Sequence, residues 1–483
     1  MPPDGTRRPP PARPPGGTNG NRHEDPFGLP LPPEPEARFG SAWSFAAVLA
    51  FLVSVALYAW FWIGEGKPVG AALIFIPILV VLTTPIFLWA ARSERNFDLA
   101  GLLAVGLLVR FIATYYRYDT AVDARTYNVW GTRLAESFRE LNFTPDTHSD
   151  VPGTGSMRYI SGLVHAVCNS DEMAAFLIFA WIAFLGCYFL YRAFVTAVPD
   201  ADRYRYAVLL FFWPSIVFWP GSIGKESVML FSLGLAALGA ARFFTRKRGG
   251  ITLVFVGILI TYLVRPHVAL IMLVALGFAL LIGRGQSRPT QSLTPGSVAK
   301  AAAIVLLLLG GSYIAGRTAR FLGVESLQPS STEEAFLEVQ TNTRKGGSEF
   351  SPADAANPIG YPQAAVTILF RPFLFEAHTS EQIATALEAL GLALLFVVSW
   401  RRLLSVPWRL RAQPYVALSL AFVLVFFFVF AVISNFGILA RERTMLLPFV
   451  LALLSVPAMS TNTIPKKPVT SARGTSRIGS APR

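Results

Sequence analysis

Two carboxylates four positions apart are the first residues whose types and spacing suggest chemistry. Asp119 and Asp123 stand at the two ends of the segment Asp-Thr-Ala-Val-Asp. If this segment is helical, both side chains lie on one face of the helix. There they would hold a divalent cation, or one of them would serve as a general base. The other interpretation is that both are solvated, or paired with Arg117 and Arg125.

A lysine at the start of an expected helix forms a second candidate group. In Pro-Gly-Ser222-Ile-Gly-Lys225-Glu226, the proline and glycine let the chain turn, and Ser222 is expected to cap the helix that follows. Lys225 then falls in the first turn, where the helix dipole and the ammonium group both favour an anion. Alternatively, Lys225 extends to a membrane interface and Glu226 neutralises it.

Further cationic side chains are expected on the same side of a membrane as these groups, the outer side. The positive-inside rule disfavours cations on that side. They lie in long loops or beside apolar runs: Arg158, Arg265, Arg371, Arg441 and Arg443. The planar fork of arginine binds phosphate with two parallel hydrogen bonds. The alternative is that these arginines pair with Glu226, Glu442 or a loop carboxylate. His267 would assist proton transfer, or would be a satisfied histidine at the interface.

These groups require a scaffold that brings them together, and the composition indicates which one. Hydrophobic residues make up 53% of the 483 positions and charged residues 15%, with a mean hydropathy of +0.49. Runs of roughly twenty apolar residues are long enough to cross a bilayer as helices. The sequence predicts an all-α polytopic membrane protein with about twelve spans, near 43–63, 69–91, 98–115, 171–194, 205–219, 224–243, 250–264, 267–283, 299–316, 383–400, 415–434 and 443–460.

Charge in the loops predicts the orientation of these spans. Arginine and lysine gather in alternate short connections, such as 401–411, which places both chain termini in the cytoplasm of a multi-pass cell-membrane protein. The short stretch 362–376 is interrupted by Arg371-Pro372, so it is expected to be a re-entrant or interfacial helix rather than a span. Loops 116–170 and 317–382 then face outward, with short surface helices such as 134–141 and 159–167.

The two ends of the chain differ from the region 41–460 between them. Residues 1–40 are rich in proline and are expected to form a disordered cytoplasmic tail, and 461–483 a second, basic one. The net charge of +13 is spread over short loops, and no basic patch interleaved with aromatics suggests a nucleic-acid partner. Two cysteines give no metal-ligand spacing. The oligomeric state has no signature in the sequence.

The early carboxylate loop and the outward arginines together resemble a known family. Asp123-Ala-Arg-Thr-Tyr127 is similar to the Asp-x-x-x-Tyr pattern of the C-type (GT-C-like) integral-membrane glycosyltransferases. Ser222-Ile-Gly-Lys225-Glu226 and the segment from Asn435 to Arg443 resemble parts of actinobacterial polysaccharide-polymerase-like membrane proteins. Here the acidic loop follows the third expected span, whereas in the C-type fold it usually follows the first.

The resemblance implies sugar transfer from a polyprenyl phosphate or diphosphate carrier on the outer face of the membrane. Asp123 would act as base or metal ligand, with Asp119 beside it, and a divalent cation is the cofactor left open. Tyr127, Glu226 and His267 would join the outward cations in binding the substrate, with membrane lipids around them. Two rivals stay open: a transporter or flippase of lipid-linked glycans, and a non-catalytic protein of envelope assembly.

Overall fold

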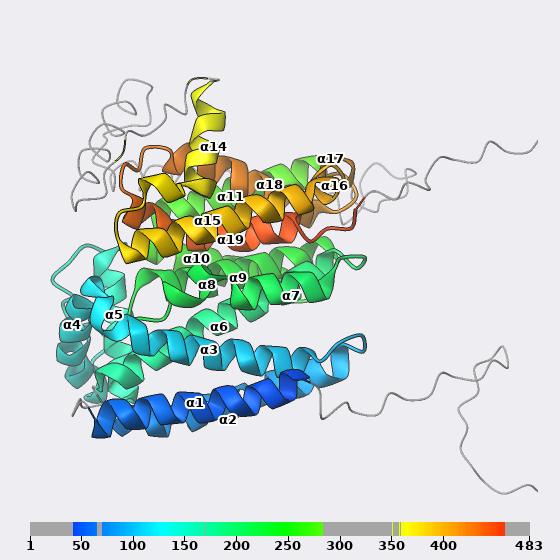
Figure 1. The fold of residues 1–483 in the computed structure, drawn as a ribbon. Coiled ribbons are helices and arrows are strands. Elements are labelled where there is room, and N and C mark those ends of the chain that lie inside the picture. The colour runs from blue at the N-terminus through cyan, green and yellow to red at the C-terminus, as the bar shows by residue number, and fades with distance from the viewer. Residues whose placement is uncertain are drawn as a thin grey trace, which may run out of the picture. The chain divides into compact units, whose positions relative to one another are not determined.

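The protein is described here from a computed structural model. It covers residues 42–64, 70–169, 171–283, 350, 357 and 359–458, and every regular element in these ranges is a helix (Figure 1). The expected tails 1–40 and 461–483, the expected span 299–316 and most of loop 317–382 lie outside the described residues. The all-helical expectation is confirmed for the described part of the chain.

The helices before position 200 include the two predicted loop helices. They are α1 (Ala42–Ile63), α2 (Gly70–Ser93), α3 (Leu99–Thr120), α4 (Val122–Arg139), α5 (Thr154–Val167) and α6 (Glu172–Ala197). The helices α4 and α5 begin earlier than expected. In α4 the buried positions recur every three or four residues, and the polar residues between them hide the pattern in the sequence.

The later helices are shorter on average and often begin at a proline. They are α7 (Arg203–Phe212), α8 (Pro214–Phe218), α9 (Lys225–Phe244), α10 (Gly250–Val264), α11 (Pro266–Ile282), α14 (Gly360–Phe370), η1 (Leu374–Glu376), α15 (Ser380–Val398), α16 (Trp400–Leu403), α17 (Val406–Arg409), α18 (Pro414–Phe430) and α19 (Phe436–Leu453). Proline lacks an N–H and fits the first turn, so it divides the expected span 205–219 into α7 and α8.

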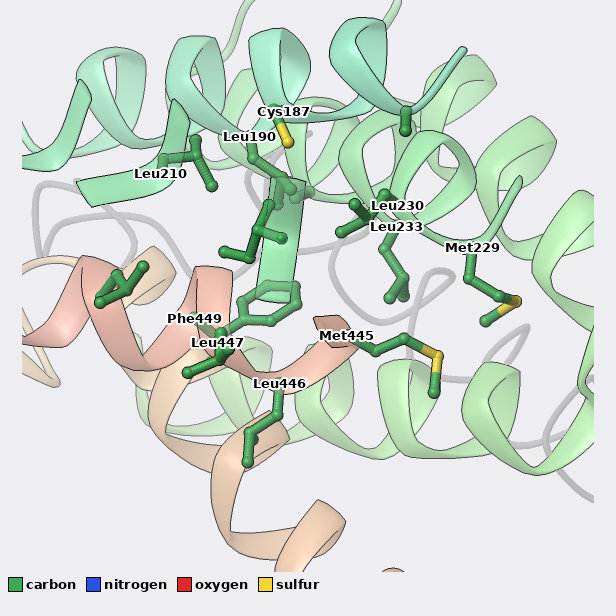
Figure 2. Packing of buried hydrophobic residues seen from close by; sticks show 14 of the residues in the cluster. Cys187, Leu190, Leu210, Met229, Leu230, Leu233, Met445, Leu446, Leu447 and Phe449 are labelled. Atoms are coloured by element: carbon green, nitrogen blue, oxygen red, sulfur yellow. The ribbon is translucent and has the colours of Figure 1, made fainter. Parts of the chain in front are cut away.

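Glycines allow the central helices to approach closely. A Cβ atom on Gly186 in α6 would overlap the Leu230 backbone of α9, and one on Gly257 in α10 would overlap the Ala236 backbone. Such contact between backbones is the packing that small residues permit in membrane bundles. Figure 2 shows Leu190 of α6, Leu230 of α9 and Phe449 of α19 meeting in this core.

Six described helices are long and apolar enough to cross a membrane, namely α1, α2, α3, α6, α9 and α15. A bent pair formed by 400–409 and α18, at 113°, would be a seventh, and α10 and α11 are shorter apolar helices. In α1 and α15 only 17% of the apolar window is buried, against 72% in α6 and α9. A soluble protein rarely leaves so much contiguous apolar surface exposed. The count of twelve spans stays a prediction.

The helices place chemistry-bearing residues at two ends (Figure 1). The α4–α5 end carries these two helices and the first turns of α9, α11 and α19. The α16–α17 end carries the first turns of α3, α7 and α18.

Candidate functional site

Asp123 lies in the first turn of α4 and pairs with an arginine from the far end of the sequence. Its Oδ2 atom is 2.8 Å from Nη1 of Arg441 in α19, and its side chain is 56% exposed. Asp119 was expected on the same helix face as Asp123, and this expectation is wrong. The helix α3 ends at Thr120, and Ala121 separates it from α4, so the two aspartates belong to different helices.

Glu226 is the buried centre of the site. Its Oε1 atom accepts from Nη2 of Arg265 at 3.1 Å and from Nη2 of Arg441 at 3.2 Å. Glu226 lies in the first turn of α9, whose N-cap is Gly224 rather than Ser222. A carboxylate removed from water needs such partners, because its charge is otherwise costly to bury.

Arg265 extends this arrangement to a third carboxylate. It lies between α10 and α11, and its Nη1 atom pairs with Glu442 of α19. Asp123, Arg441, Glu226, Arg265 and Glu442 therefore form a continuous chain of alternating charges, named here the ion network. The sequence left pairing with Glu226 or Glu442 open for the arginines, and Arg265 pairs with both.

Lys225 lies beside the ion network but outside it. Its charge interacts with those of Arg265, Glu226, Asp123 and Arg441. Among the described residues, Lys225 forms no ion pair or hydrogen bond. Whether Lys225 binds an anion or extends to the membrane interface stays a prediction.

Tyr127 and His267 lie near charged groups of the site. Burial raises the pKa of Tyr127, and the negative charges of Asp123 and Glu226 raise it further, so its hydroxyl is a hydrogen-bond donor. His267 lies in the first turn of α11, where the charges of Arg265 and Lys225 act on it. The centre of its ring is 5.6 Å from that of the Phe430 ring.

Two further arginines from the sequence analysis form a separate polar cluster. Arg371 donates hydrogen bonds from both Nε and Nη2 to the Glu376 carboxylate, and its guanidinium lies over the rings of Phe350 and Phe436. Arg443, two positions after Arg441 in α19, donates to the Arg371 carbonyl. Within the described part of the chain, no hydrogen bond or ion pair joins Arg371 or Arg443 to the ion network.

Arg158 is more remote from the network. Its guanidinium lies 4.2 Å from the centre of the Trp130 ring and donates to the carbonyls of Thr147 and His148. It therefore holds the connection between α4 and α5 against α5.

Arg117 belongs to the site although the sequence analysis did not place it there. The expected span ended at position 115, but α3 continues to Thr120 and buries Arg117 in its last turn. Its charge interacts with those of Arg441, Glu226 and Asp123. The signal in the sequence was a cation two positions after the end of a predicted span, between tyrosines at 116 and 118 that continue the helix.

The electrostatics of the site favour an anionic ligand. The ion network carries one excess negative charge, and Lys225 with Arg117 turns this into one excess positive charge. The first turns of α9, α11 and α19 add the positive ends of their dipoles. In the described ranges, no three histidine, cysteine, aspartate or glutamate side chains group as metal ligands.

Comparison with protein-family models, curated proteins and solved structures finds no match to this chain. Functional inference therefore rests on the geometry of its own residues.

Proposed function

We propose that the chain is a membrane glycosyltransferase that takes sugar from a polyprenyl phosphate or diphosphate carrier. The observation that supports this best is the position of Asp123. It is a half-exposed carboxylate at the edge of a cationic group, at the end of a bundle with apolar outer faces. A lipid-linked sugar presents the matching features: an apolar tail, an anionic phosphate and a sugar.

Each residue has a defined part in the proposed reaction. Lys225 and the arginines beside it bind the carrier phosphate and stabilise the charge that develops on it as it leaves. An acceptor hydroxyl attacks the anomeric carbon, so a new carbon–oxygen bond forms while the bond to the phosphate oxygen breaks. Asp123 receives the hydroxyl proton. The ligand phosphate competes for Arg441, which releases Asp123 from its ion pair.

The membrane placement belongs to the same proposal. The helices α1, α2 and α15 would face lipid with their exposed apolar side chains, such as Phe45, Leu82 and Leu394. The α4–α5 end would lie at the outer face of the cell membrane, and the chain termini in the cytoplasm. There α4 and α5 would form the vestibule through which the acceptor arrives.

The buried Arg110 bears on the transporter alternative. Transport of a charged headgroup calls for available charged groups along the path through the bilayer. Arg110, in the middle of α3, instead donates to the carbonyls of Gly106 and Phe211 and to the Cys187 sulfur. These contacts occupy it inside the bundle, which favours transfer over transport.

The test is mass spectrometry of lipid-linked sugars in cells that lack the protein. Complementation uses wild type, Asp123→Asn and the control Asp146→Asn, a change in the exposed loop between α4 and α5. We expect a lipid-linked sugar to accumulate in the null strain and with Asp123→Asn, but not with the control. Loss of a general base should slow transfer by about 10²–10⁴-fold.

The identity of the accumulated lipid refines or rejects the proposal. A monophosphate-linked sugar indicates a transferase, and a diphosphate-linked repeat unit on the outer leaflet indicates a polymerase or ligase. A repeat unit retained on the inner leaflet would indicate a flippase and overturn sugar transfer. Unchanged glycolipids would leave the non-catalytic assembly role.

A further inference from the structure

Arg117 is a buried cation with very few partners. Its side chain is almost fully enclosed, with 7% of the residue exposed, yet among the described residues its guanidinium donates one hydrogen bond, to the Thr120 hydroxyl at 3.1 Å. The Nε atom has no hydrogen-bond partner, and Arg117 forms no ion pair among the described residues. Burying a guanidinium in this state is costly, because it loses water without gaining an equivalent anion.

The surroundings of Arg117 hold it in place without a direct ion pair, and the carboxylates of Glu226, Glu381 and Asp123 act on its charge from a longer distance. Its guanidinium lies 5.0 Å from the centre of the Phe218 ring and 5.1 Å from that of Trp219, at the end of α8. The same loop passes Gly221, next to the Arg117 side-chain stem, and then reaches Lys225 in the first turn of α9. Ring faces attract a cation weakly and leave its N–H groups at the ring edge available.

Arg110 and Arg441, two other buried or partly buried arginines nearby, have more partners than Arg117, although the Nε atom of Arg110 also has no hydrogen-bond partner among the described residues. Arg110 donates three hydrogen bonds, and Arg441 contacts two carboxylates. Lys225 and Arg117 are the two cations around the ion network that lack a carboxylate partner in the described residues. The charges of Asp123, Glu226 and Arg441 interact with both cations.

We infer that Arg117 is a phosphate ligand, which together with Lys225 binds the anionic group of the substrate beside the ion network. This inference rests on the proposed function for its substrate, where the phosphate is that of the lipid carrier. The planar fork of Arg117 would bind two phosphate oxygens, and Lys225 would supply a point charge. Arg265 then mainly holds Glu226 and Glu442, while Arg441 keeps its contact with Glu226 and exchanges Asp123 for the phosphate.

The experiment measures binding to the full chain in nanodiscs of neutral lipid. The probes are farnesyl phosphate, farnesol as the uncharged control, and inorganic phosphate. The variants are Arg117→Gln, Arg117→Lys and the matched control Arg192→Gln. Arg192 also lies over a tryptophan, 3.8 Å from the centre of the Trp89 ring, and donates to the Tyr188 hydroxyl.

We expect Arg117→Gln to weaken farnesyl phosphate binding by about ten- to a hundredfold, as the loss of charged hydrogen bonds implies. Arg117→Lys should fall between this variant and wild type, and Arg192→Gln should bind like wild type. Competition by inorganic phosphate would identify the phosphate group alone as the ligand. Its failure to compete, with the Arg117 dependence intact, would identify a lipid-borne phosphate.

The inference is overturned if Arg117→Gln binds farnesyl phosphate as wild type does, or if farnesol binds equally well. It is also overturned if wild type binds none of the probes. Because no sugar transfer is measured, this result is independent of the glycolipid analysis. Arg117-dependent binding with unchanged glycolipids would reject the transferase and keep the phosphate site.

Discussion

The two ends of the bundle use similar residues in different ways. At the α16–α17 end, three arginines each pair with one carboxylate: Arg203 with Glu94 at 3.2 Å, Arg402 with Asp202 at 2.9 Å and Arg409 with Asp200 at 2.7 Å. At the α4–α5 end, two arginines bridge three carboxylates in a single ion network. The difference lies in how the charges are shared.

Separate pairs fasten helix ends together. Asp202, for example, also caps α7 by accepting from the Arg205 N–H, and Arg402 donates to the Val456 carbonyl after α19. In the ion network, each inner member depends on two neighbours, and its outer member Asp123 is the most exposed. Such a chain can exchange that outer contact for a ligand while its buried centre stays paired. The single ion pairs at the α16–α17 end therefore fit a structural role, whereas the ion network fits the binding role proposed for it.

The largest effect should come from removing the buried centre of the network. Glu226→Ala leaves Arg265 and Arg441 without their shared carboxylate, which should lower the free energy of unfolding by about 3–5 kcal/mol. Asp200→Ala removes the exposed partner of Arg409 and should lower it by about 1 kcal/mol or less. Chemical unfolding in detergent micelles measures both. Equal losses would show that the two ends are held in the same way.

A smaller effect should follow from replacing a bridging arginine. Arg441→Lys keeps the charge but loses the fork that reaches both Asp123 and Glu226. Losing one charged hydrogen bond should reduce stability by about 1.5–3 kcal/mol. Arg409→Lys, in a single pair, should stay within about 1 kcal/mol of wild type. The same unfolding measurement tests this prediction. If Arg441→Lys does not change the free energy of unfolding, one of the two contacts of Arg441 contributes nothing to stability.

The last comparison concerns pH and asks which end of the bundle loses stability first as the pH falls. Burial, with a contribution from Arg139, lowers the pKa of His165 in α5 to about 4. The folded state then binds fewer protons than the unfolded state once the pH falls below about 6.5, the ordinary histidine pKa, so stability decreases from there down to pH 4.

Asp200 supplies the contrast at the other end. It is partly buried, which opposes ionisation, but the hydrogen bond and charge of Arg409 keep its pKa below the usual value. Its contribution is therefore retained until the pH falls below about 4. Hydrogen exchange near pH 7 and pH 5 should show α5 losing protection while 198–202 does not. His165→Gln should remove the change, and a persistent change would assign it to another group.

Continuous apolar runs were predictable from the sequence, and interrupted ones less so. The bounds of α10 match the expected 250–264, because arginines flank an unbroken apolar run and Pro266 follows it. The end of α3 was placed five residues too early, since a charged Arg117 normally marks the end of a span. Buried contacts with Phe218 and Trp219 carry the helix past that charge.

For the site, the sequence indicated residue types but not partners. The predicted topology put Asp123, Lys225, Arg265 and Arg441 at one end of the bundle. In the structure Asp123 pairs directly with Arg441, and Arg265 is linked to Arg441 through Glu226. The predicted topology did not indicate that Arg371 and Arg443 would form their own cluster. Pairing depends on the rotation of each helix about its axis, and α19 points Arg441 and Arg443 in different directions from positions only two apart.

The contact between Asp123 and Arg441 joins residues 318 positions apart. It therefore links α4 to α19, and the ribosome synthesises α19 hundreds of residues after α4. Chains are synthesised from the N-terminus at roughly 5–20 residues per second. For tens of seconds during insertion, Glu226 and Asp123 exist without Arg441. The ion network can therefore form only after Arg441 has been synthesised, and a product truncated before that residue cannot form it.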